Sequence, residues 1–185
     1  MSGAAARPGP DLASEATRFD RLLAGTSRAM AATGSLSILA LVLLVDADIL
    51  GRELFSAPVR GVSELLALAV VAILFLQLPE TLRAGRLARS ELLLDRLRVA
   101  RPRAAQALEA LVHAIGAALF LLLVVAVLPV LTEAWREELY VGAIGDFTAP
   151  VWPVRLATIA GAALTALIFA RIAFGALGRA FGSRP

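Results

Sequence analysis

Five ionisable residues lie inside or beside the most apolar stretches of the chain, where side chains of this type could bind or relay ions: Asp46, Asp48, Glu64, Glu109 and His113. An ionisable group in the middle of a membrane costs at least about 2.5–3.5 kcal/mol, so it often indicates function. Asp46 and Asp48 are separated by about 200° around a helix, which excludes a shared carboxylate pair. Asp48 precedes Arg52 by four residues, the favourable order for an ion pair on one helix face. We therefore interpret the two aspartates as a polar cap at the end of an apolar helix.

The other three candidates also have structural explanations. Glu64 lies in the first turn of a predicted helix, where the positive end of the helix dipole favours an acid, and Arg60 lies four residues earlier. Glu109 and His113 could relay a proton, but a hydrogen-bonded contact at a helix interface is the more frequent use of such a pair. The middle thirds of all four predicted membrane helices contain no charged residue. This argues against a proton or ion pathway through this chain alone.

No residue is assigned to catalysis, substrate binding or a metal site. The chain has no cysteine and a single histidine, which excludes disulfides, thiolate nucleophiles and multi-histidine metal sites. We interpret the acidic residues Glu133, Glu137 and Glu138 as a solvated face, because no histidine accompanies them. No phosphate-binding glycine loop or nucleophile motif is present, and we expect no cofactor in this chain.

The composition indicates what kind of protein carries these residues. Of 185 residues, 59% are hydrophobic and 18% are charged, and the mean hydropathy is +0.79. A soluble domain carries about 45–50% apolar residues, in a count that includes glycine, and about 25% charged residues. We therefore predict an all-α integral membrane protein. Four runs have the length of a membrane-crossing helix, the second stopped by Pro79: 29–50, 62–78, 110–131 and 154–174.

The distribution of arginine predicts how these helices are oriented. All eighteen basic residues are arginine, and fourteen of them lie in the N-terminal segment, the second connection and the C-terminal end. Since positive charge in short loops favours the cytoplasmic side, both termini are predicted to be cytoplasmic. Because the arginines flank apolar runs and form no basic stripe with interleaved aromatics, they also argue against a nucleic-acid partner.

The connection between the second and third predicted helices contains an amphipathic segment. Ser90 can cap the start of a helix, and the following apolar residues share one face: Leu92, Leu93, Leu94, Leu97 and Val99. We expect this helix to lie in the membrane interface, where its arginines can bind anionic lipid. The predicted organisation is a flexible N-terminus (1–10), a cytoplasmic amphipathic segment (11–28), a four-helix membrane domain (29–178) and a cytoplasmic tail (179–185).

Aromatic and small residues mark the last third of the chain. The third connection carries Trp135, Tyr140, Phe147 and Trp152, which we interpret as anchors because Trp and Tyr favour the membrane–water boundary. On the fourth predicted helix, small residues repeat at a spacing that lets helices approach closely: Ala157, Gly161 and Thr165.

Three segments resemble the small permease (membrane) subunit of TRAP transporters, the tripartite ATP-independent periplasmic transporters. Residues 52–64 resemble the first periplasmic connection of that family, 85–97 its cytoplasmic stretch, and 145–152 the entry to its fourth helix. The sequence departs from the pattern in three places. Leu87 and Glu91 stand where the family often has His and Asp, and residues 158–161 lack a proline that the family often has. The resemblance implies that eight residues of these segments are structural or form subunit contacts: Arg52, Phe55, Pro58, Glu64, Glu91, Asp95, Pro150 and Trp152.

The resemblance further implies a non-catalytic, multi-pass subunit of the bacterial cytoplasmic (inner) membrane. In that family the small subunit scaffolds a large, many-helix permease, which carries the substrate and sodium sites. A periplasmic binding protein delivers the solute, often a carboxylate, to a docking surface that the small subunit helps to form. Within this picture, Arg52 and Glu64 fix the ends of the first two membrane helices.

Two other functions stay open from the residues themselves. The chain could be a self-sufficient, small proton-coupled multidrug-type exporter that uses an acidic residue; loss of export by Asp48→Asn and Glu64→Gln would support this. It could also be the membrane anchor subunit of a redox enzyme, which a bound haem or redox cofactor would support.

Overall fold

The computed structural model describes residues 10–85, 102–143 and 147–181, and most of these residues are helical. The described elements are α1 (Pro10–Phe55), α2 (Val62–Arg83), α4 (Pro102–Arg136), β1 (Tyr140–Ala143), β2 (Phe147–Pro150) and α5 (Trp152–Phe181). Each of these four helices contains a stretch long and apolar enough to cross a membrane. The prediction of four helices that could span a membrane is therefore confirmed, whereas the cytoplasmic placement of both termini stays a prediction.

Helix α1 is longer than predicted. An amphipathic segment over 11–28 and a membrane helix over 29–50 were expected, but a single helix of 46 residues runs through both. No proline occurs between residues 11 and 57, so nothing interrupts its backbone hydrogen bonds. At 1.5 Å per residue α1 is about 69 Å long, more than twice the roughly 30 Å thickness of a hydrocarbon core. Part of α1 therefore extends beyond the core at any tilt common among membrane helices.

Two prolines lie inside helices and do not end them. The prediction that Pro79 stops the second helix is wrong, because α2 continues through it to Arg83. Pro79 has no N–H to donate to the carbonyl of Phe75, four residues earlier. Likewise, α4 continues through Pro129 as far as Arg136. The apolar runs thus located the crossing parts of the helices but not their ends.

The expected all-α class missed a small β-hairpin. Strands β1 and β2 are antiparallel, with Tyr140 opposite Pro150 and Ala143 opposite Phe147. Each strand has four residues, too few for an alternating pattern to distinguish a strand from a loop. Gly142 has a φ of 111°, a conformation that residues with a side chain rarely adopt. The hairpin gives a defined structure to most of the connection between α4 and α5.

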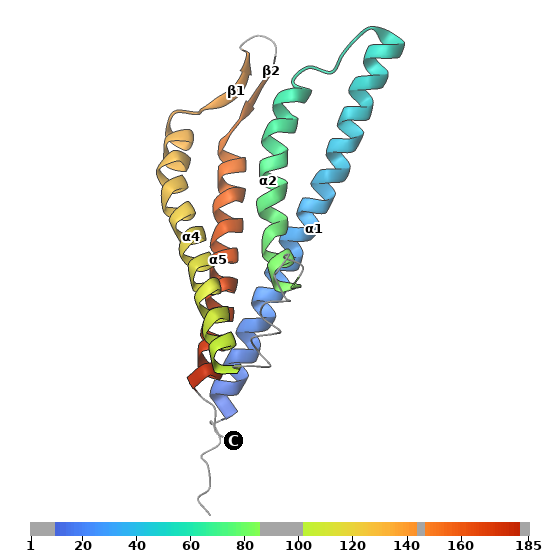
Figure 1. Cartoon of the computed structure of the whole chain (residues 1–185). Helices are drawn as coiled ribbons and strands as arrows, with labels where there is room; N and C mark the ends of the chain where they lie inside the picture. The colour runs from blue at the N-terminus through green and yellow to red at the C-terminus, as the bar shows by residue number, and fades with distance from the viewer. Residues whose placement is uncertain (1–9, 86–101, 144–146, 182–185) are drawn as a thin grey trace, which may run out of the picture.

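Helix α5 is the central helix of the bundle. It packs against α4 on one side and α2 on the other, while α1 packs mainly against α2 (Figure 1). In the most apolar 18-residue window of each helix, 28% of α5 is buried, against 6% in α1 and α2 and none in α4. Within the described part of the chain, few residues of these apolar windows are therefore buried.

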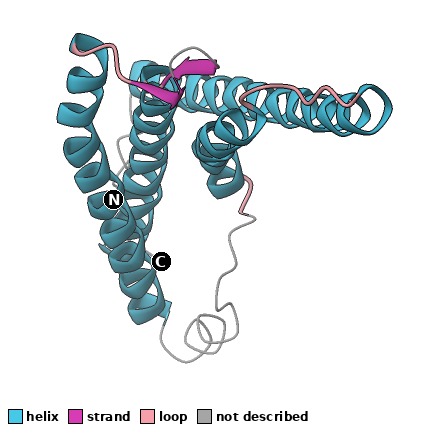
Figure 2. Cartoon of the chain, turned by 90° about the horizontal axis from the view of Figure 1, so that it is seen from above, coloured by secondary structure: helices cyan, strands magenta, loops and turns pink. Residues whose placement is uncertain are grey.

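Helix α1 diverges from α2 on the way to their connection, residues 56–61, and near that connection it stands apart from the other three helices (Figures 1 and 2). This connection and the β-hairpin lie at the same end of the bundle, which we call the hairpin end. We call the other end, near the C-terminus, the tail end.

Candidate interaction surface

Asp48 joins the hairpin end of α1 to the connection that follows it. Its Oδ2 accepts a hydrogen bond from Arg52 Nη2 at 2.7 Å, and its Oδ1 accepts one from the backbone N–H of Val59 at 2.8 Å. The predicted ion pair between Asp48 and Arg52 is confirmed. Asp48 is the more buried residue of the pair: its side chain is 12% exposed, whereas that of Arg52 is 64% exposed. Because charge-assisted hydrogen bonds are the stronger ones, Asp48 holds the connection against α1.

The backbone of the same connection turns back on the end of α1. The N–H of Ala57 donates to the carbonyl of Gly51 at 3.0 Å, and Ser56 adopts a φ of 48°. Phe55 and Pro58, which the resemblance marked as contact residues, are both exposed on this turn. They are therefore accessible to a partner.

The start of α2 meets the β-hairpin at Gly61, which caps α2 with a φ of 75°. A Cβ at this position would fall 2.0 Å from the ring of Phe147, so the site needs glycine both for its conformation and for space. Glu64 follows in the first turn of α2, as predicted, and accepts a hydrogen bond from Ser63 Oγ at 2.9 Å. Phe147 thus joins the two connections at the hairpin end.

Two tryptophans pair where α4 and α5 meet the hairpin. The rings of Trp135 and Trp152 have centroids 4.8 Å apart and an interplanar angle of 71°, an edge-to-face arrangement that aromatic pairs prefer. With Tyr140 and Pro150 they line an open groove beside the hairpin. Arg155 also donates a hydrogen bond to the carbonyl of Val130 and so ties α5 to α4. The role of Trp152 as a membrane anchor stays a prediction.

Gly161, in the small-residue repeat of α5, lies where α5 contacts α2. A Cβ on the buried Gly161 would fall 2.1 Å from the carbonyl oxygen of Phe75. That oxygen is the one that Pro79 leaves without its usual helical donor. The hydrogen that glycine carries in place of a side chain points towards it, which makes a weak C–H···O contact. The prediction that the small-residue repeat permits a close approach is therefore confirmed at Gly161.

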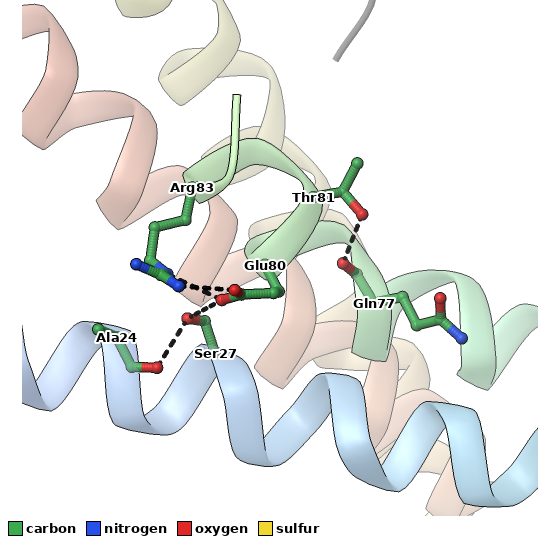
Figure 3. Close-up of polar contacts among 6 residues, drawn as sticks. All are labelled: Ala24, Ser27, Gln77, Glu80, Thr81 and Arg83. Carbon is green, nitrogen blue, oxygen red and sulfur yellow. Dashed lines mark hydrogen bonds and ion pairs between the residues drawn. The ribbon is translucent and has the colours of Figure 1, made fainter. Parts of the chain in front are cut away.

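Sequence reasoning missed a polar cluster that joins α1 and α2 at the tail end (Figure 3). Glu80 accepts hydrogen bonds from Arg83 Nε and Nη2 at 2.8 and 2.6 Å, and from Ser27 Oγ at 2.7 Å. Ser27 is fully buried. The three-residue spacing of Glu80 and Arg83 on one helix could have suggested their pairing. Nothing in the sequence indicated Ser27, which is 53 residues from Glu80.

A second polar contact joins α1 to α5 at the tail end. Arg171 Nε and Nη2 donate to Asp20 Oδ1 and Oδ2, both at 3.0 Å. Both side chains are about half exposed. The pair orients α1 against α5, while the Ser27–Glu80–Arg83 cluster holds α1 against α2.

The remaining residues that the sequence singled out either have structural roles or lie outside the described residues. His113 is buried, its Nδ1 is 2.6 Å from the main-chain carbonyl oxygen of Glu109, and its ring contacts Phe169 of α5. This supports the interpretation of His113 as an interface residue. Within the described ranges no three His, Cys, Asp or Glu residues are placed to hold a metal ion. Glu91, Asp95 and the predicted interfacial helix lie outside the described residues.

Replacing Asp48 should loosen the hairpin end more than replacing Arg52. Asp48→Ala removes both acceptor oxygens and leaves the Val59 N–H without its partner, so we expect the free energy of unfolding to fall by about 1–3 kcal/mol. Arg52→Ala should lower it by less than about 1 kcal/mol, because an exposed ion pair contributes little. Thermal unfolding in detergent micelles measures both variants. Equal losses would contradict the central role of Asp48.

Comparison with known proteins gives one finding about family. The model of the family described as "Tripartite ATP-independent periplasmic transporters, DctQ component" matches residues 41–179. The match includes the crossing part of α1 from residue 41 and all of α2 and α4, and it runs into the last turn of α5. No curated protein and no solved structure matches the chain.

Proposed function

The chain belongs to the DctQ component family of tripartite ATP-independent periplasmic (TRAP) transporters, and from this membership we propose that it is the small membrane subunit that scaffolds the large permease subunit. In this proposal the large subunit carries out sodium-coupled uptake of an organic, carboxylate-bearing solute. A periplasmic binding protein delivers the solute, and the complex lies in the bacterial inner membrane. The small subunit itself catalyses no reaction.

The observation that carries the proposal is the separation of charge from apolar surface. The ion pairs described lie at the two ends of the bundle: Asp48–Arg52 at the hairpin end, and Glu80–Arg83 and Asp20–Arg171 at the tail end. Between these ends, α1, α2 and α4 carry many large apolar side chains that the described residues leave exposed. A chain that moved a polar solute would need polar groups along the path between the ends. The arrangement instead supports a role in holding other helices.

Transport by reconstituted proteoliposomes tests the proposal. The solute is first identified as the organic acid that raises the thermal unfolding temperature of the purified binding protein. We expect no uptake of that labelled acid by the small subunit alone. With the large subunit and the binding protein present, an inward sodium gradient should raise uptake at least tenfold. Uptake or proton-linked export by this chain alone would overturn the proposal.

A further inference from the structure

An apolar groove lies between α1 and α2 on the side of the hairpin end. The two helices touch at Gly34, where a Cβ would fall 2.9 Å from the side chain of Gln77. From there they diverge, and the groove opens between residues 38–46 of α1 and 66–73 of α2, with a volume of about 450 Å³. Its lining is aliphatic except for a single residue, Asp46. The groove is therefore a wedge bounded by a helix contact at one end and by the 56–61 connection at the other.

Asp46 differs from Asp48 in having no partner within the described chain. Asp48 is held by Arg52 and Val59, whereas Asp46 makes no hydrogen bond or ion pair with any described residue. Asp46 lies six residues before Arg52, or about 9 Å farther from the hairpin end along α1, within the apolar stretch of that helix. A carboxylate at this depth is costly unless another group binds it.

We propose that the groove receives one transmembrane helix of the large permease subunit, and that a basic side chain of that helix binds Asp46. This inference rests on the proposed function, which supplies a partner with many helices. The part of α1 that lines the groove, residues 38–46, is about 12 Å long, which corresponds to about two turns of a packed helix. Helices pack with their axes 8–10 Å apart, a spacing that a wedge between diverging helices can accept.

Charge and depth favour this occupant over a lipid or a second copy. An acyl chain has no hydrogen-bond donor, and the ammonium group of a lipid lies at the headgroup level, nearer to Arg52 than to Asp46. A second copy of this chain carries no basic residue between positions 29 and 51 or between 61 and 82. It would also bring a second Asp46 to the contact. A basic residue on a partner helix can lie at the same depth as Asp46 and carries the opposite charge.

Cross-linking from single cysteines tests the occupant directly. The chain contains no cysteine, so Val42→Cys and Val70→Cys on the groove walls each give one site for a photoactivatable label. Leu122→Cys on the exposed face of α4 serves as the reference position. In the complex with the large subunit in nanodiscs, we expect both groove positions to cross-link to one and the same helix of the large subunit. Mass spectrometry should find a basic residue on that helix.

Substitution of the acid tests its part in the contact. Asp46→Asn should lower the recovery of the complex at least fivefold, whereas Glu53→Gln, which changes an exposed acid of α1 outside the groove, should leave recovery unchanged. Thermal unfolding of the isolated chain should not change for Asp46→Asn, because no described residue of the chain binds Asp46. Exchanging Asp46 with the basic residue of the partner helix should restore recovery.

The outcomes separate this inference from the proposed function. Groove labels that attach to lipid, to a second copy of this chain or to nothing, in a complex that stays intact, would overturn the groove assignment and leave the scaffold role standing. Unchanged recovery with Asp46→Asn would overturn the role of the acid. Failure of the unmodified chain to bind the large subunit at all would overturn the proposed function and the inference together.

Discussion

Gly161→Ala is expected to force α2 and α5 apart and to destabilise the bundle by about 1–3 kcal/mol, the usual cost of inserting atoms into a packed contact. The added Cβ would fall 2.1 Å from the carbonyl oxygen of Phe75 and 3.0 Å from its Cβ. The first of these atoms belongs to the backbone of α2, so no side-chain rotation relieves the clash. The methyl group would also displace the C–H···O contact to an oxygen that Pro79 leaves without its helical donor.

Gly178→Ala provides a matched control on the same helix. A Cβ at Gly178 meets nothing within 4 Å, and alanine is the better helix former by up to about 1 kcal/mol. This variant should therefore leave stability unchanged or raise it. Thermal unfolding in detergent, followed by circular dichroism, measures both changes. Equal behaviour of the two variants would show that the approach of α5 to α2 does not limit stability.

Glu80→Ala is expected to detach α1 from α2 at the tail end. It removes the acceptor for Ser27 Oγ and for Nε and Nη2 of Arg83. The Arg83 and Glu80 side chains are only 29% and 22% exposed. Hydrogen bonds to charged groups contribute about 1.5–3 kcal/mol, and we expect a loss of that size in the free energy of unfolding. Unfolding of this variant in denaturant, in detergent micelles, provides the measurement.

Asp20→Ala is the control for Glu80→Ala, because it breaks an ion pair of α1 that is about half exposed. It should lower the free energy of unfolding by less than about 1 kcal/mol. A double-mutant cycle between Ser27→Ala and Glu80→Ala then isolates the contact between the helices. Additive effects of the two substitutions would contradict a direct stabilising contact between Ser27 and Glu80.

The parts of the fold that depend on local sequence could be predicted. Runs of apolar residues indicate crossing helices whatever the neighbouring helices do, and the Asp48–Arg52 pair follows from a four-residue spacing within one helix. Helix ends depend on more than apolarity. Because α2 continues through Pro79 and α1 continues through its polar N-terminal part, both are longer than their apolar runs.

The contacts that depend on helix placement could not be predicted. The repeat around Gly161 indicated that some helix approaches closely, but not that α2 does so, nor that its point of approach is the carbonyl of Phe75. The bond between Ser27 and Glu80 needs the angle between α1 and α2, which neither helix contains by itself. The partner of the Asp48 carboxylate in the connection, the N–H of Val59, likewise depends on how the chain turns after α1.

The contact of Phe147 with Gly61 has a consequence for the order in which the protein is made. At a synthesis rate of roughly 5–20 residues per second, Gly61 is translated about 4–17 s before Phe147, which lies about 90 residues later. A similar interval separates Phe75 from Gly161. The α1–α2 pair therefore enters the membrane well before the segment that covers the start of α2 and the helix that packs against its middle. The last helix to be made is α5, and a chain arrested before it would lack the helix that packs against both α2 and α4.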